Sequence, residues 1–368
     1  MGSRVAIDAG GSATTRRRML ASLCLLAVLA WQGPKADAQS PAVTVDDDGT
    51  VHVPAQAIPI TSFLSPEGRA YLTEHLKLPE HPEMFEERDG VPRFMEAYLA
   101  RAKVLYPVET EVTSIAGVPS YVYKPKAGIA DRNRNRVLIE LHGGGFSGCA
   151  TACRELESLP IAALGRIRVI GVDYRQGPEH RFPAASEDVA AVYSELLKTY
   201  PAENIGIYGC SAGGILTGMA LAWFQRQGLP PPGAVGILCS GLNVPGEPFI
   251  GDGDYMAVPL GEARVGIFPP STTGYFEGTD PNDPLISPVR SPGVLAQFPP
   301  SIVVTGTRAM ELSSAVYAHS QLIRNGAVSE LHVWEGMIHG FFYNTDFPEA
   351  REYFDVMLEF FDRRLGSD

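Results

Sequence analysis

The 368-residue sequence is poor in cysteine and in positive charge, and each shortage excludes a class of protein. It has five cysteines, too few for a disulfide-stabilised scaffold in a chain of this length. Its net charge of −12 repels phosphate backbones, so nucleic acid is not a predicted partner. Histidine and cysteine do not occur at zinc-ligand spacings, and the glycine patterns of nucleotide-binding loops are missing. We therefore predict neither a metal nor a cofactor.

The sequence also lacks a hydrophobic run long enough for a transmembrane helix. Arg16–Arg18 precede thirteen uncharged, mostly apolar residues, Met19–Trp31, whereas a spanning helix needs about 20. Small residues at Ala36–Ala38 then match the site that a signal peptidase accepts. We predict that residues 1–38 are a cleavable signal peptide and that the protein is periplasmic or secreted, without stable membrane insertion. Both the twin-arginine and the ordinary secretory route fit this segment.

The remaining chain changes pattern twice. Residues 39–60 are extended and rich in turns, and apolar residues at helical spacing follow from Ser65 to about Val104. After residue 105, short apolar strands alternate with helices, which is typical of a mostly parallel sheet with helices on both faces. The proline-rich stretch 241–299 is too long for a passive loop, so we expect it to cover another part of the protein.

The predicted elements after residue 105 are eight strands and five helices. The strands are predicted at Thr110–Ile115, Val118–Tyr123, Val137–Leu141, Ile167–Val172, Asn204–Tyr208, Ala234–Leu238, Ser301–Thr305 and Glu330–Trp334. The helices are predicted near 153–165 and 184–199 and over 212–226, 312–324 and 348–364.

The strongest local signal for chemistry is the run Gly209-Cys210-Ser211-Ala212-Gly213-Gly214 between a predicted strand and a predicted helix. A serine in such a turn adopts strained backbone angles, and only small residues two positions away avoid collision. This context predicts Ser211 as a nucleophile and the Ala212 amide, at a helix N-terminus, as an oxyanion donor. The alternative is that the glycines serve only helix–sheet packing.

Two glycine-rich loops supply the other candidate groups. His142-Gly143-Gly144-Gly145 follows the strand Val137–Leu141, and glycines there let backbone N–H groups approach a carbonyl oxygen. We interpret His142 as a brace for this loop rather than as a proton carrier. His339, in a loop after the strand Glu330–Trp334, is placed to take a proton from Ser211.

Five motifs in one order resemble the hormone-sensitive lipase-like α/β-hydrolases, the bacterial family IV carboxylesterases, over roughly residues 105–365. They are His142–Phe146, Asp173–Arg175 with Pro178–Ala185, Gly209–Gly214, Asp283–Pro288 and Gly336–Phe341. The resemblance implies an α/β-hydrolase fold for residues 105–368 and a helical cap within residues 39–104. It also implies Ser211 as nucleophile, His339 as general base, and the amides of Gly143, Gly144 and Ala212 as oxyanion donors.

The sequence departs from this family at the catalytic acid. Ala309 stands where the family has an aspartate, and the nearest following carboxylate is Glu311. The chain order of Ser211, Glu311 and His339 fits the fold, so we predict Glu311 as the acid, with Asp283 as the reserve candidate. The alternatives are that Glu311 merely opens a helix, or that neither residue is the acid.

The cysteines leave further questions open. Cys210 stands where the family usually has Asp or Thr, and we interpret it as a packing residue rather than a rival nucleophile. Cys149 and Cys153 lie four residues apart, close enough to be bridged or to remain independent thiols.

These observations predict an exported serine carboxylesterase that hydrolyses small-molecule esters of short to medium acyl chains through an acyl-enzyme. A deacetylase or carbamate hydrolase on the same machinery is a second hypothesis. A non-catalytic protein that binds small molecules on a hydrolase scaffold is a third. Family members often form homodimers, and the sequence does not decide between a monomer and a homodimer.

Overall fold

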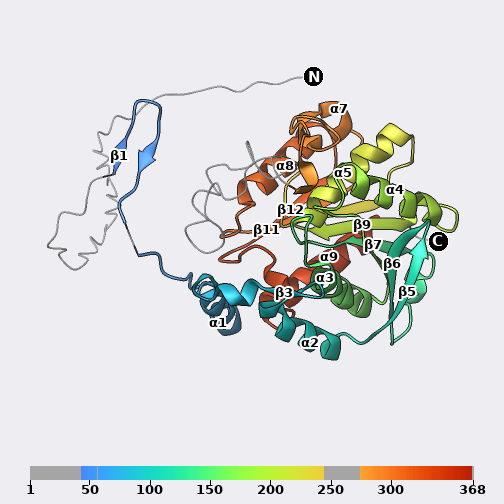
Figure 1. Cartoon of the computed structure of the whole chain (residues 1–368), viewed down its shortest axis with the longest axis horizontal. Coiled ribbons are helices and arrows are strands. Elements are labelled where there is room, and N and C mark those ends of the chain that lie inside the picture. Colours follow the sequence, from blue (N-terminus) through green and yellow to red (C-terminus); the bar gives the residue numbers. More distant parts are fainter. Residues whose placement is uncertain (1–42, 56, 244–273, 367–368) are drawn as a thin grey trace, which may run out of the picture. The chain divides into compact units, whose positions relative to one another are not determined.

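The computed structural model describes residues 43–55, 57–243 and 274–366, which fall into two compact units divided after Ala57 (Figure 1). In the first unit, β1 (Thr44–Val45) and β2 (Val51–His52) form an antiparallel ribbon. The predicted signal peptide, residues 1–38, lies outside the described residues, as does much of the stretch 241–299.

An eight-stranded sheet forms the centre of the second unit, with the strand order β12-β11-β10-β9-β7-β8-β6-β5. β6 runs antiparallel to both of its neighbours, and all other neighbouring pairs are parallel. The strands are β5 (Val108–Ile115), β6 (Val118–Pro125), β7 (Val137–Leu141), β8 (Arg168–Val172), β9 (Ile205–Cys210), β10 (Ala234–Leu238), β11 (Ser301–Gly306) and β12 (Ser329–Trp334). All eight predicted strands are confirmed, with ends within two residues.

Helices cover both faces of this sheet, which confirms the predicted α/β architecture (Figure 1). One face carries α3 (Ala150–Gly165) and α9 (Pro348–Arg364), and the other carries α4 (Ala184–Leu196), α5 (Ala212–Gln227) and α8 (Leu312–Arg324). The two faces hold separate apolar cores, because alternate strand residues point to opposite sides. The short helix α7 (Pro292–Leu295) precedes β11. In the part of the chain that the structure describes, no helix has the length and apolarity to cross a membrane.

The helical pattern predicted from Ser65 to Val104 is broken in the structure. α1 (Pro66–His75) and α2 (Glu96–Leu105) are separated by 3-10 turns and by a two-stranded ribbon, β3 (Glu87–Arg88) and β4 (Val91–Pro92). Prolines at 79, 82 and 92 and the Asp89-Gly90 turn interrupt the helix, since proline lacks the donor that a helix interior needs.

The N-terminal helices belong to the same compact unit as the sheet, so residue 104 is not a boundary between compact units. α2 packs against α3, and α1 is joined to α9 by hydrogen bonds. The backbone amide and hydroxyl of Ser65 donate to the two carboxylate oxygens of Glu349, at 2.7 and 2.8 Å. The same hydroxyl accepts the Gly68 amide and caps α1.

Candidate active site

Ser211 lies at a sharp turn between β9 and α5, with φ 57° and ψ −119°. Positive φ is rare for a residue with a side chain and is strained there. The Ser211 amide donates to the Leu238 carbonyl of the neighbouring strand at 2.8 Å, which ties the turn to the sheet. The predicted elbow, residues 209–213, is therefore present in its predicted strand-to-helix context.

The glycines on either side of Ser211 are required by close backbone contacts. A Cβ atom on Gly213 would lie 1.6 Å from the Leu141 carbonyl oxygen, and one on Gly209 would lie 2.2 Å from the same atom. No heavy atom can approach a backbone oxygen so closely. The end of β7 thus presses directly on the elbow, which explains the small residues two positions before and after the serine.

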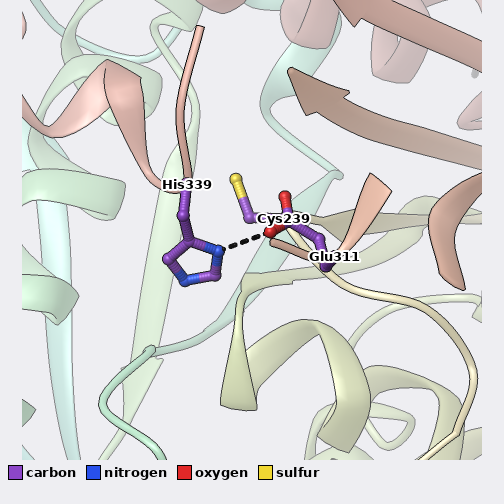
Figure 2. Close-up of side chains that lie close together, drawn as sticks. All are labelled: Cys239, Glu311 and His339. Carbon is purple, nitrogen blue, oxygen red and sulfur yellow. Dashed lines mark hydrogen bonds and ion pairs between the residues drawn. The ribbon is translucent and has the colours of Figure 1, made fainter. Parts of the chain in front are cut away.

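Glu311 and His339 meet at the ends of β11 and β12 (Figure 2). The ring nitrogen Nδ1 of His339 lies 2.8 Å from Oε2 of Glu311. The other carboxylate oxygen, Oε1, accepts the hydroxyl of Thr305 at 3.0 Å. Glu311 and Thr305 are buried, and the His339 side chain is 17% exposed. A buried carboxylate so paired fixes the ring orientation and directs Nε2 away from the acid.

Cys239 is a third neighbour in this group. Its Sγ lies within 4.8 Å of ligand atoms of Glu311 and His339, and these are residue types that hold zinc. Each ligand atom already has a protein partner, because the Gly340 amide donates to Sγ at 3.3 Å and Glu311 bonds to the histidine. Hydrogen bonds to one another or to the backbone of the histidine loop thus account for the positions of these three side chains.

Asp283, the reserve acid, occupies a turn in the structure. Its Oδ1 accepts the Leu285 amide at 2.9 Å, and its carbonyl accepts the amides of Ile286 and Ser287. This is the local bonding that aspartate makes in turns. Glu311, and not Asp283, is thus the carboxylate hydrogen-bonded to His339.

The glycine-rich loop after β7 corrects one predicted donor. The Gly143 amide donates to the buried carboxylate of Glu157 at 3.1 Å, so it is turned away from the role of oxyanion donor. Among the described residues, the amides of Gly144 and Ala212 have no protein acceptor, and Ala212 opens α5, where first-turn amides lack helical partners. Gly145, which the sequence analysis did not name as a donor, shares this property and has φ 63°.

His142 is fully buried and braces the loop as expected. Its Nδ1 lies 2.7 Å from the Gly143 carbonyl, and its ring stacks on Tyr174 at 4.3 Å. Burial lowers the pKa of His142 to about 4, because the charged imidazolium would lose its hydration there. Its Nε2 has no hydrogen-bond partner among the described residues. The imidazole is therefore neutral near pH 7.

The cysteines divide into a bridge and two buried thiols. Cys149 and Cys153 form a disulfide at the start of α3, so the open question of their state is settled as bridged. Cys210 and Cys239 are free and buried. Burial raises the pKa of the Cys210 thiol well above its usual value, which disfavours the reactive thiolate and fits a packing role.

Sequence reasoning missed Glu157, Thr305 and Cys239. Each is a common residue type in an apolar element, so no local pattern distinguishes it from a packing residue. Their roles can be recognised only when the fold brings α3 and the ends of β10 and β11 close to the candidate site.

Comparisons with known proteins identify the family of the chain. The sequence model of the α/β hydrolase fold family matches residues 138–343. The chain is 28% identical over 246 residues to an acetyl-hydrolase of Streptomyces hygroscopicus, covering 64% of this chain and 78% of that protein. It is 31% identical over 253 residues to a putative acetyl-hydrolase, LipR, of Mycobacterium tuberculosis, covering 65% and 75%.

Solved structures of esterases also resemble this chain. The crystal structure of esterase E25 superposes with a TM-score of 0.70 at 26% identity, covering 86% of this chain and 99% of that one. An esterase from the bacterial hormone-sensitive lipase family gives 0.68 at 27% identity, covering 82% and 99%. The chain therefore belongs to the α/β hydrolase fold family, among the hormone-sensitive lipase-like esterases.

Proposed function

We propose that the protein is a serine carboxylesterase with Ser211 as nucleophile, His339 as general base and Glu311 as the orienting acid. The observation that carries this proposal is the 2.8 Å contact between His339 Nδ1 and Glu311 Oε2, together with the strained turn at Ser211. A scaffold retired from catalysis has no need to keep a buried carboxylate on a histidine, so these contacts favour an enzyme over a binding protein.

In the proposed reaction, Ser211 Oγ attacks the ester carbonyl carbon while His339 Nε2 takes its proton. The negative charge on the former carbonyl oxygen is stabilised by the amides of Gly144, Gly145 and Ala212, each worth about 10²–10³ in rate when well placed. His339 returns the proton to the leaving alcohol, which yields an acyl-enzyme. Water activated by the same histidine then releases the acid.

For the substrate, we propose esters with short acyl groups, acetate in the first place. The two relatives named acetyl-hydrolases support this preference. A deacetylase acting on a larger alcohol uses the same chemistry and is included in this proposal.

We also propose that the protein works outside the cytoplasm. The Cys149–Cys153 disulfide supports this, because disulfides persist in oxidising compartments. The basic and apolar N-terminal segment supports it too. Intact mass of the protein recovered from periplasm and medium tests it, since cleavage is expected to leave Gln39 as the first residue.

Hydrolysis of a p-nitrophenyl ester series from acetyl to dodecanoyl tests the enzymatic proposal. We expect turnover that favours short chains and that falls by at least about 10⁴-fold in Ser211→Ala. Cys210→Ser, which alters the adjacent buried side chain, is the matched control and is expected to keep most of the activity. Turnover that survives Ser211→Ala would contradict the proposed nucleophile.

A further inference from the structure

A carboxyl group with no place in the proposed reaction lies directly behind the site. Glu157, on the third turn of α3, is 2% exposed. Its Oε1 accepts the Gly143 amide at 3.1 Å and the Tyr343 hydroxyl at 2.8 Å, and its Oε2 accepts the Cys210 amide at 3.0 Å. One side chain thus bonds to three separate loops.

Each of these three loops carries one functional element of the proposed site. Gly143 immediately precedes the oxyanion amide of Gly144, Cys210 immediately precedes Ser211, and Tyr343 follows His339 by four residues. A Cβ on Gly143 would lie 2.7 Å from the Tyr343 hydroxyl oxygen, so the tyrosine also packs against the loop. Glu157 therefore connects the oxyanion loop, the elbow and the histidine loop.

The surroundings of Glu157 make a carboxyl group there costly. Burial raises its pKa, whereas its three donors favour the ionised form and lower it. Burial and the nearby Glu157 also raise the pKa of Glu140, on β7, well above its usual value. An apolar residue in this position would avoid that cost, as replacements of buried charges show in other proteins. An apolar side chain would, however, leave the Gly143 and Cys210 amides without this acceptor.

We propose that Glu157 is a positioning residue, which fixes the oxyanion loop to the nucleophile elbow by accepting one backbone amide from each on its two carboxylate oxygens. The inference rests on the proposed function. With the Gly143 amide held by Oε1, the orientation of the next peptide, which carries the Gly144 amide, is restricted. With the Cys210 amide held by Oε2, the entry to the strained turn at Ser211 is fixed at the same time.

The variant Glu157→Gln tests this role. It keeps the size of the side chain but places an NH₂ group opposite one of the two backbone amides, so donor faces donor. We expect kcat to fall about 10–100-fold with KM within about threefold, because misplaced oxyanion donors weaken binding of the transition state and not of the substrate. Glu155→Gln, two residues away on α3 and paired with the exposed Lys103, is the matched control and is expected to keep wild-type kinetics.

A second readout separates this inference from the proposed function. The rate at which a fluorophosphonate labels Ser211 depends on the nucleophile and the oxyanion amides but requires no ester turnover. We expect labelling of Glu157→Gln to slow by a factor similar to the loss in kcat. If the wild type labels but hydrolyses no ester, the proposed substrate class fails, and equal labelling of the wild type and Glu157→Gln overturns the inference in either case.

The inference stays falsifiable if Glu157→Gln does not fold. Tyr343→Phe removes one of the donors to Oε1 and leaves both backbone amides in place. We expect it to lower kcat and the labelling rate about 3–10-fold at unchanged KM, which is the size of one hydrogen bond. Wild-type values for a folded Tyr343→Phe, or for a folded Glu157→Gln, would show that the carboxylate is merely a structural group.

Discussion

The elbow at residues 209–213 and the acid–histidine pair, Glu311 with His339, are held in place by different forces. Backbone atoms fix the elbow, because β7 presses on Gly209 and Gly213 so closely that no side chain fits. Side-chain hydrogen bonds fix the acid–histidine pair, through the contacts of Glu311 with Thr305 and His339. Steric exclusion is absolute over a few tenths of an ångström, whereas a hydrogen bond weakens gradually as its atoms move apart. A substitution in the elbow should therefore abolish activity at once, whereas a substitution in the acid–histidine pair should lower kcat by an amount that depends on the contact removed.

The largest effect is expected from Gly213→Ala, which leaves every functional side chain in place. The new Cβ would lie 1.6 Å from the Leu141 carbonyl oxygen and 2.9 Å from that of His142. We expect a loss of more than about 4 kcal/mol of folding free energy, with no turnover. Thermal unfolding followed by circular dichroism measures it. Gly218→Ala on the same helix, where the atom nearest to the new Cβ is the flexible end of Leu242, is the control. A folded, active Gly213→Ala would show that the elbow is not sterically fixed.

A smaller but still large effect is expected from Glu311→Gln. The amide can still contact the ring of His339 but carries no charge to stabilise the imidazolium that forms during attack. We expect kcat to fall about 10³–10⁴-fold with the fold intact, as found when the acid of such a triad is neutralised. Asp283→Asn, which neutralises the turn aspartate, serves as the control and should retain activity. If the two variants exchange these outcomes, the acid has been assigned to the wrong residue.

The smallest effect of these three changes is expected from Thr305→Val. Valine matches threonine in shape and removes the hydroxyl that donates to Glu311 Oε1 at 3.0 Å. We expect kcat to fall about tenfold, since one hydrogen bond to a charged group is worth about 1.5–3 kcal/mol and part of it is replaced by relaxation. Thr305→Ser restores the donor and should recover most of the rate. Steady-state kinetics of the wild type, Thr305→Val and Thr305→Ser test whether kcat falls gradually as the contacts of the acid–histidine pair are weakened.

The same contrast explains how much the sequence could predict. The elbow could be predicted because the residues it requires, Gly209, Ser211 and Gly213, lie within five positions of the chain, although the backbone atom that excludes larger residues belongs to Leu141. Glu311 could be predicted only with Asp283 in reserve, because the contact with His339 spans 28 residues. The partners that hold Glu311 from behind, such as Thr305, are found only when the strands are assembled.

Errors in the sequence analysis have a similar origin. The predicted role of the Gly143 amide as an oxyanion donor is wrong, because a run of glycines does not indicate which peptide faces which side, and Glu157 on α3 determines this. The ribbon at residues 87–92 was missed because apolar residues on both of its sides keep helical spacing. The Cys149–Cys153 bridge stayed open because cysteines four residues apart are neighbours on a helix whether or not they are oxidised.

The bond between Ser65 and Glu349 has a consequence for the order in which the protein forms. The two residues are separated by 284 positions. A ribosome adding about 5–20 residues per second needs about 15–60 seconds to travel from one to the other. During that interval α1 exists without the carboxylate that anchors it, and buried residues such as Leu72 have no completed α9 to pack against. Among the described residues, the helix that is synthesised first is thus held by the helix that is synthesised last.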